Sequence, residues 1–235
     1  MSKVLFSFGH GYSARALAAR LLPQGWRIYG TTRDATKAEA LRAEGVIPLL
    51  WEADDLTPAL HEATHLLSSA GPTEEGDPVL ARWRDQIAAI ASRLTWAGYL
   101  STTGVYGDHQ GAWVDEDTPL TPSTKRGRLR VAAEAEWQAI PGLPLHIFRL
   151  AGIYGPGRGP FEKVRARTAR RIIKPGQVFS RIHVDDIAQV LAASIYSSVT
   201  QTLDWHFAAA QAVILFLGIA LTLIPYFRLT GGRHG

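Results

Sequence analysis

The sequence predicts an α/β fold in which a doubly wound parallel sheet is covered by helices on both faces. Short apolar runs alternate with helix-length segments from Lys3 to Leu150, and such alternation favours parallel strands joined by right-handed crossovers. A glycine-rich turn follows the first apolar run and leads straight into the first helical segment. The 235 residues, 46% hydrophobic and 20% charged, can bury a sizeable core and exclude a disordered chain.

The individual elements follow from apolar runs and from the turn residues between them. Strands are expected at residues 4–8, 26–31, 46–51, 65–69, 96–101 and 145–150. Helices are expected at 13–22, at 35–44, from Asp77 to about Leu94, and at 128–139. Asp77 and Pro78 are typical of an N-cap followed by a proline in the first turn. Pro and Gly residues end the other helices.

The first turn reads Gly9, His10, Gly11, Tyr12, Ser13 and Ala14, a G-x-G-x-x-A pattern. Gly9 permits a tight turn, Gly11 lets the backbone approach a pyrophosphate, and Ala14 lets the helix pack closely on the strand. The helix N-terminus then offers free N–H groups to phosphate. Because the pattern follows the first strand of a βα series, it predicts dinucleotide binding. The alternative is a glycine turn without a ligand.

The residues that end the second strand usually decide between NAD and NADP, because a carboxylate there binds the ribose 2′-hydroxyl and an arginine accommodates a 2′-phosphate. Here Thr31 and Thr32 stand where an acid is expected, and Arg33 follows. A guanidinium pairs with a phosphate. We therefore predict NADP as the cofactor. NAD stays open because Asp34 could reach the ribose, and in a further interpretation Asp34 caps the next helix while Arg33 is merely solvated.

Residue counts exclude several classes of site. The chain has no cysteine, which excludes a disulfide scaffold, a thiolate zinc site and a cysteine nucleophile, and is compatible with the cytoplasmic location that we expect. A net charge of +4 favours anionic ligands only weakly, and no nucleic-acid partner is expected. The eight histidines show no metal-ligand spacing, so no metal site is expected.

One short stretch is more basic than the rest, and it contains Lys163, Arg165, Arg167, Arg170, Arg171 and Lys174. On a helix, positions 167, 170, 171 and 174 would share one face. The stretch could bind an anionic group of the substrate, bind a polyanion, or form a solvated basic face. It lacks the interleaved aromatic residues that single-strand binders use.

Motifs recur in order along the rest of the chain. They are Ser-Thr-Thr-Gly-Val-Tyr-Gly at 101–107, Asp-Glu-Asp-Thr-Pro at 115–119, Arg-Leu-Ala-Gly-Ile-Tyr-Gly-Pro-Gly-Arg at 149–158 and Ile-His-Val-Asp-Asp-Ile-Ala at 182–188. In order and spacing they resemble the extended short-chain dehydrogenase/reductase family, the NAD-dependent epimerase/dehydratase group. The resemblance extends from Lys3 to about Ala193 and implies the Rossmann form of the predicted fold.

By that resemblance, Asp55 matches the acid after the third strand that contacts adenine. Ser69, Ala70 and Gly71 match the loop after the fourth strand that lines the cofactor. Thr102 matches the hydroxyl that polarises a carbonyl or alcohol of the substrate.

The family's chemistry uses a Tyr-x-x-x-Lys pair, in which the lysine lowers the pKa of the tyrosine for proton transfer. Aligned on the Ala-Ala-Glu that follows, this chain has Arg126 in place of the tyrosine and Arg130 in place of the lysine. Arginine stays protonated and cannot act as a general base. We therefore expect an atypical member of the family.

Three interpretations of this departure stay open. Arg126 and Arg130 could clamp a carboxylate or phosphate while Thr102 relays a proton. Tyr106 could supply the phenol instead, although in the family it is mainly structural. The chain could also bind the cofactor with little or no turnover.

The C-terminal part departs from the family after about Tyr196. We expect a cofactor domain with a partial substrate region at 1–196 and an atypical hydrophobic segment at 197–235, so the substrate lobe is truncated or altered. Residues 207–227 contain no charged residue. The length of this segment is close to the roughly 20 residues that span a bilayer. The segment could be a membrane anchor, a buried helix that covers the sheet, or the product of a frameshift.

The sequence as a whole predicts an NAD(P)-dependent oxidoreductase or epimerase/dehydratase-like protein that acts on a small anionic or sugar-like substrate. The alternative is a non-catalytic NADP-binding sensor or regulator. A small-molecule substrate is the expected partner, and homodimer formation is left open.

Overall fold

The computed structural model describes residues 3–169 and 178–201. The chain divides into two compact units, Met1–Ile195 and Tyr196–Gly235. The expectations for residues 207–227, and for Arg170, Arg171 and Lys174, lie outside the described residues. Within the described ranges, no helix has both the length and the apolar character needed to cross a membrane.

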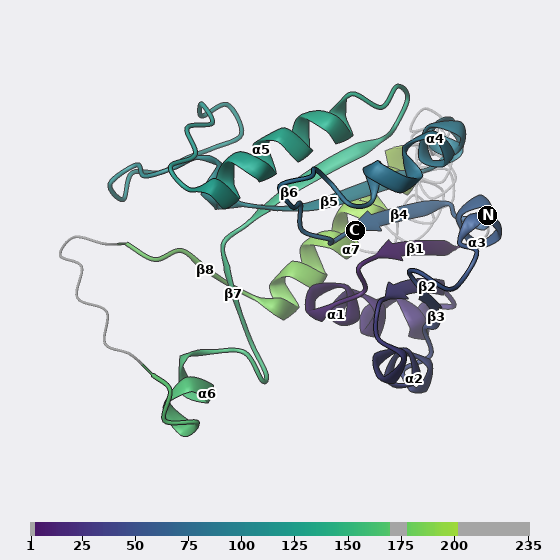
Figure 1. Cartoon of the computed structure of the whole chain (residues 1–235), viewed down its shortest axis with the longest axis horizontal. Coiled ribbons are helices and arrows are strands. Elements are labelled where there is room, and N and C mark those ends of the chain that lie inside the picture. Colours follow the sequence, from purple (N-terminus) through teal and green to yellow (C-terminus); the bar gives the residue numbers. More distant parts are fainter. Residues whose placement is uncertain (1–2, 170–177, 202–235) are drawn as a thin grey trace, which may run out of the picture. The chain divides into compact units, whose positions relative to one another are not determined.

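The main sheet of the first unit is parallel throughout (Figure 1). Its strands are β1 (Val4–Phe8), β2 (Arg27–Thr32), β3 (Ile47–Leu50), β4 (His65–Ser68), β5 (Trp96–Thr102) and β6 (Leu145–Leu150). They lie in the order β3-β2-β1-β4-β5-β6, so the chain reverses its direction of winding between β1 and β4. This is the predicted doubly wound Rossmann sheet, and the fold class is confirmed.

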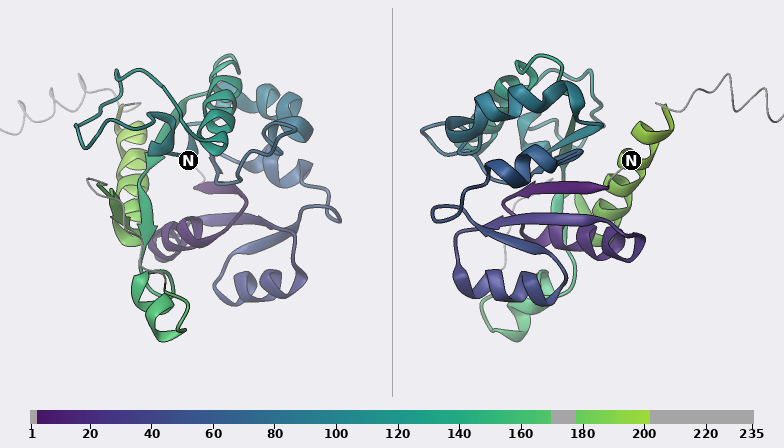
Figure 2. Two further views of the ribbon diagram at one scale, coloured as in Figure 1. Left: turned by 60° about the vertical axis from the view of Figure 1, so that its left-hand side comes forward. Right: turned by 90° about the vertical axis from the view of Figure 1, so that its right-hand side faces the viewer.

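Helices cover both faces of this sheet, with α4 and α5 on one side and α1 and α2 on the other (Figures 1 and 2). The helices are α1 (Tyr12–Leu21), α2 (Ala35–Ala43), α3 (Thr57–Glu62), α4 (Leu80–Ile90), α5 (Lys125–Gln138), α6 (Pro160–Arg165) and α7 (Val184–Gln201). Short 3₁₀ turns follow α1 and α4, and a third (Thr103–Val105) follows β5. A second, two-stranded parallel sheet joins β7 (Gly152–Tyr154) to β8 (Arg181–His183).

A cluster of buried apolar residues lies between the sheet and the helices α3, α4 and α5. It includes Phe6 and Phe8 of β1, Leu66 of β4, Tyr99 of β5 and Trp137 of α5, all buried. Successive strand residues point to opposite faces, so the intervening residues of β1 and β5 face α1 and α7. On that side, the Trp96 indole nitrogen donates to the Ser194 hydroxyl of α7 at 2.9 Å. Both faces of the sheet are therefore buried, which agrees with the continuous apolar runs of the sequence.

Two helix starts differ from the predicted bounds. The Asp77 carboxylate accepts from the Val79 and Leu80 amides, at 2.9 and 3.1 Å, as expected of the predicted N-cap, although the regular helix α4 begins only at Leu80. The Thr124 hydroxyl accepts from the Gly127 amide at 3.0 Å, so α5 begins at Lys125 and not at 128. These caps satisfy amides that a helix start would otherwise leave without acceptors.

The expected helical face of basic residues is wrong at its first member. The helix α6 ends at Arg165, and Arg167 beyond it has a left-handed backbone with φ 53°. Arg165 pairs with Glu162 at 3.2 Å within α6. Arg167 therefore does not continue a helix that begins at Pro160.

Candidate functional site

The glycine loop after β1 has the geometry that its sequence pattern predicts. Gly9 has φ 69°, a conformation that other residues rarely adopt. A Cβ atom on Gly9 would lie 3.1 Å from the Ala70 backbone nitrogen. The Gly9 amide donates to the Thr31 hydroxyl at 2.8 Å, which fixes the loop to the end of β2.

The loop after β4 lies directly against the glycine loop. The Ser69 amide donates to the Phe8 carbonyl at 3.0 Å, and the Ser69 hydroxyl donates to the Gly9 carbonyl. The structure therefore brings Ser69 and Ala70 beside Gly9, at the carboxyl ends of β1 and β4. In open α/β sheets, ligands bind in the crevice where the strand order reverses, and this is that place.

The first turn of α1 leaves its amides available to a ligand. Gly11 is the N-cap residue, so no side chain caps the helix, and the first turn contains no acidic residue. Tyr12 is the first helical residue, whereas Ser13 and Ala14 are buried against the sheet. A helix N-terminus of this kind carries a partial positive charge that favours an anion.

Asp34 caps a helix at the end of β2, as one interpretation of the sequence expected. Its carboxylate accepts from the Thr36 and Lys37 amides, at 2.9 and 3.3 Å. The Thr32 hydroxyl accepts from the Asp34 amide at 3.2 Å. Arg33 is exposed, and no hydrogen bond or ion pair holds its guanidinium within residues 3–169 and 178–201. The carboxylate is thus occupied, and the neighbouring cation is available.

Asp55 lies at the start of α3, where its carboxylate accepts from the Thr57 amide at 3.0 Å. Hydrogen bonds from the amide and the hydroxyl of Thr57 lower the pKa of this exposed carboxyl group. The sequence did not predict α3, which is only six residues long. Contact of Asp55 with adenine stays a prediction.

Arg130 is buried, and its side chain forms a hydrogen bond with the loop after β4. Its guanidinium donates to the Leu100 carbonyl at 2.7 Å, to the Tyr99 hydroxyl at 3.0 Å and to the Ala70 carbonyl at 3.3 Å. Burial raises the pKa of Tyr99 to about 12, so the phenol stays neutral there. Arg130, which is predicted to replace the family's lysine, therefore contacts the loop that is expected to line the cofactor.

Arg126 and Thr102 lie differently from Arg130. Arg126 is exposed in the first turn of α5 and has no hydrogen bond among the described residues. The half-buried Thr102 ends β5, and its hydroxyl accepts from the Gly104 amide at 3.2 Å. The structure therefore does not join the two arginines into one clamp, because only Arg130 points into the protein.

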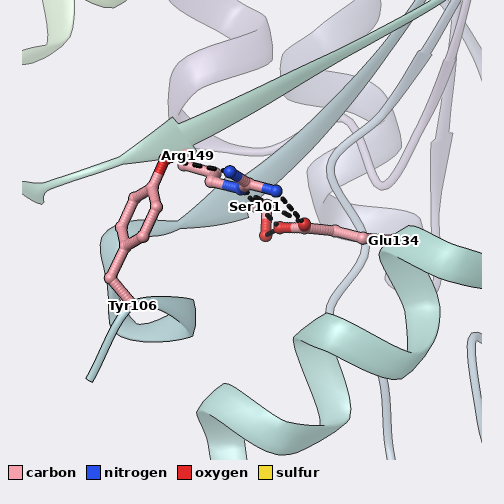
Figure 3. Close-up of polar contacts among 4 residues, drawn as sticks. All are labelled: Ser101, Tyr106, Glu134 and Arg149. Carbon is pink, nitrogen blue, oxygen red and sulfur yellow. Dashed lines mark hydrogen bonds and ion pairs between the residues drawn. The ribbon is translucent and has the colours of Figure 1, made fainter. Parts of the chain in front are cut away.

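A largely buried network joins Ser101, Tyr106, Glu134 and Arg149 (Figure 3). Arg149 of β6 pairs with Glu134 of α5 at 2.9 Å and donates to the Tyr106 hydroxyl, also at 2.9 Å. The Ser101 hydroxyl donates to the same carboxylate. The sequence showed these residues only as parts of separate motifs, since pairing between a helix and a strand leaves no local pattern.

A second region of the chain reaches the glycine loop from β7 and β8. The Tyr12 hydroxyl donates to the Pro156 carbonyl at 2.9 Å, and Arg158 stacks on the Tyr12 ring. A cavity of about 940 Å³ opens beside this contact, and its lining includes Tyr154, Arg158, Glu162, Arg181 and His183. The described residues hold no cluster of three or more His, Asp or Glu side chains that could bind a metal ion.

Topology and loop geometry together define a Rossmann-type protein of the nucleotide-binding class. No family model matches the chain. A conserved protein of unknown function from Silicibacter pomeroyi is 65% identical, with a TM-score of 0.79, over 83% of this chain and 68% of that one. A protein of Methylobacillus flagellatus, named for the NAD-dependent epimerases/dehydratases, is 29% identical, with a TM-score of 0.60, over 83% of this chain and 70% of that one.

The chain therefore shares its fold with a protein named for the NAD-dependent epimerase/dehydratase group, the group that its sequence motifs resemble. Protein YeeZ of Escherichia coli K12 is 33% identical over 173 residues, which are 68% of this chain. The match covers 62% of the length of YeeZ, so the chain spans less than two thirds of this curated relative.

Proposed function

We propose that the chain binds a nicotinamide dinucleotide, NADP in preference to NAD, and acts as an oxidoreductase or epimerase/dehydratase-like enzyme on a small anionic or sugar-like substrate. The contact between the Gly9 and Ala70 backbones carries this proposal. It places a left-handed glycine and an uncapped helix N-terminus at the point where the strand order reverses. The name of the Methylobacillus flagellatus relative supports NAD-dependent chemistry.

The preference for NADP follows from the end of β2. The Asp34 carboxylate caps α2, and the exposed Arg33 guanidinium has no protein partner in the described ranges. A 2′-phosphate on the adenosine ribose would pair with that guanidinium. A 2′-hydroxyl would gain no comparable charge-assisted bond from it.

Each of the candidate site residues has a separate role in this proposal. The dinucleotide supplies hydride chemistry when it is bound. The glycine loop and the amides of α1 hold its diphosphate, and Arg130 keeps Ala70 in place beside it. The Thr102 hydroxyl polarises a substrate oxygen. Arg126, exposed in the first turn of α5, is available to a carboxylate or phosphate of the substrate.

A second candidate function is a non-catalytic NADP-binding sensor or regulator. The burial of Arg130 favours it, because its hydrogen bonds to Leu100, Tyr99 and Ala70 give this residue a structural role. Arginine side chains are poor general acids and bases, so Arg126 and Arg130 do not supply the role of the family's tyrosine. Tyr106 is buried, and its hydroxyl is held by Arg149.

Turnover separates the two functions. We would incubate the full chain with NADPH and a library of aldehydes, ketones and keto acids, and follow the absorbance of NADPH. An enzyme turns over at least one compound, and Thr102→Ala lowers that rate about 100-fold or more, whereas the neighbouring Thr103→Ala leaves it nearly unchanged. An epimerase or dehydratase regenerates its cofactor and leaves this absorbance unchanged, so nucleotide sugars incubated with NADP⁺ would also be analysed for product by chromatography. Saturable NADPH binding without turnover in either assay would support the sensor instead.

A further inference from the structure

We propose that Arg158 binds the diphosphate of the dinucleotide, and that Tyr12 positions Arg158 for this task. The inference rests on the proposed function, because it adds a residue to the same cofactor site. Arg158 lies in the turn after β7, far along the chain from the glycine loop. Its role therefore depends on contacts that only the folded chain provides.

The turn that carries Arg158 is fastened to the glycine loop. The Tyr12 hydroxyl donates to the Pro156 carbonyl at 2.9 Å. Two reciprocal hydrogen bonds between the Gly155 and Arg158 backbones, each 2.9 Å long, close the turn. A Cβ atom on Gly155 would lie 2.6 Å from the Tyr12 hydroxyl oxygen. The glycine thus leaves the room that this contact needs.

The Arg158 guanidinium lies over the first residue of α1. Its Cζ atom is 5.5 Å from the centroid of the Tyr12 ring. No ion pair with a carboxylate neutralises it among residues 3–169 and 178–201. No acidic residue occupies the first turn of α1 either. The Tyr12 side chain therefore connects a cation that has no ion pair to the residue that begins an uncapped helix.

A diphosphate is the ligand that fits both features. The amides of α1 take the oxygens of one phosphate, and the planar guanidinium can pair with oxygens of the other. A cation–π contact with the half-buried Tyr12 ring is weaker than a charge-assisted hydrogen bond. Arg158 can therefore stay over the Tyr12 ring in the free protein and exchange this contact for the ligand.

Ligand titrations of the full chain test the proposal. The variant is Arg158→Gln, and the matched control is Arg165→Gln, an exposed arginine of the neighbouring helix that does not contact Tyr12. NADPH and ADP-ribose carry a diphosphate, whereas adenosine 2′-monophosphate does not. We expect Arg158→Gln to weaken NADPH and ADP-ribose about 10- to 100-fold and to leave adenosine 2′-monophosphate unchanged. Tyr12→Phe, which loses only the bond to Pro156, should weaken both diphosphates to a smaller extent.

The other outcomes overturn the proposal. If Arg158→Gln binds NADPH as tightly as the wild type does, Arg158 has no part in cofactor binding. The same follows if all three ligands weaken equally, or if only the KM of a carbonyl substrate changes. Absence of dinucleotide binding by the folded wild-type chain is a separate result, which contradicts the proposed function itself.

Discussion

At the scale of single residues, Glu134 shows how the protein accommodates a buried charge. Its side chain is 2% exposed, and that of its partner Arg149 is 18% exposed. Burial opposes the charge of Arg149, but hydrogen bonds to Glu134 and Tyr106 outweigh it and raise the pKa of the guanidinium. Removing one member of such a pair leaves the other charge without a partner in a poorly solvated place.

Glu134→Gln should therefore lower the free energy of unfolding by about 3 kcal/mol, measured by urea denaturation. The control is Glu62→Gln, because Glu62 pairs with Arg27 at the surface, where the two side chains are 50% and 56% exposed. The control should lose less than about 1 kcal/mol. Equal losses in the two variants would contradict the role given to the buried network.

Two buried histidines make the fold sensitive to acid. His10 and His65 are 6% and 4% exposed, and burial lowers the pKa of each from 6.5 to about 4. Neither ring nitrogen of His10 has a partner among the described residues. The unfolded chain therefore binds protons that the folded chain excludes between pH 6.5 and pH 4.

Their contribution to stability is fully present above pH 6.5 and declines as the pH falls toward 4, by up to about 3 kcal/mol for each histidine. Urea midpoints across this range measure the decline. The variants His10→Leu and His65→Leu should each flatten the profile, and their combination should flatten it most. A combined variant with the acid sensitivity of the wild type would refute this explanation.

At the scale of elements, the approach of α5 to the 3₁₀ turn after β5 depends on Gly127. A Cβ atom there would lie 2.5 Å from the Gly104 carbonyl oxygen. Gly127→Ala should destabilise the fold by about 1–3 kcal/mol, although alanine is the better helix former. Gly159→Ala is the control, because its Cβ atom would meet nothing within 4 Å. Thermal unfolding compares them, and equal midpoints would contradict the close packing.

The sequence predicted the elements whose signals are local. The predicted bounds of β1 and β6 are those observed, because each strand is a short apolar run between turn residues. The predicted start of α5 was wrong because nothing in the local sequence around Lys125 and Arg126 indicated that Thr124 is the cap. The short helices α3 and α6 and the small sheet of β7 and β8 were not predicted, since tertiary contacts stabilise such short elements.

The features of the candidate site that the sequence predicted are also the local ones. The glycine loop could be read from Gly9 and Gly11, because their conformational demands are local. The contact of Tyr12 with Pro156 could not, because it joins residues 144 positions apart in the sequence. The same holds for the bond from Arg130 to Ala70. The family resemblance identified Arg130 as a candidate site residue, but it did not predict which groups Arg130 contacts.

At the scale of the whole molecule, α7 returns the chain to the face of the sheet that also carries α1. Its buried residues Ile187, Leu191 and Ile195 have no exposed surface, and Arg20 donates to the Asp185 carbonyl at 3.3 Å. The start of α7 is therefore part of the core of the first unit. The motif at 182–188 supported a family resemblance but did not predict this helix or its burial.

Leu191→Ala should cost about 2–5 kcal/mol of unfolding free energy because it leaves a cavity. Its neighbour Val190 is 51% exposed, so Val190→Ala should change stability by no more than about 0.5 kcal/mol. Urea denaturation followed by tryptophan fluorescence measures both. A small effect of Leu191→Ala would mean that α7 contributes little to the core.

The central claim is that the glycine loop at the centre of the sheet holds a nicotinamide dinucleotide. The most direct test titrates NADPH and NADH into the full chain and follows tryptophan fluorescence, with Arg33→Gln and the exposed Arg42→Gln as a variant and its control. We predict saturable binding, tighter for NADPH, and a loss of about 10- to 100-fold in NADPH affinity for Arg33→Gln alone. Failure of the folded chain to bind either dinucleotide would contradict the claim.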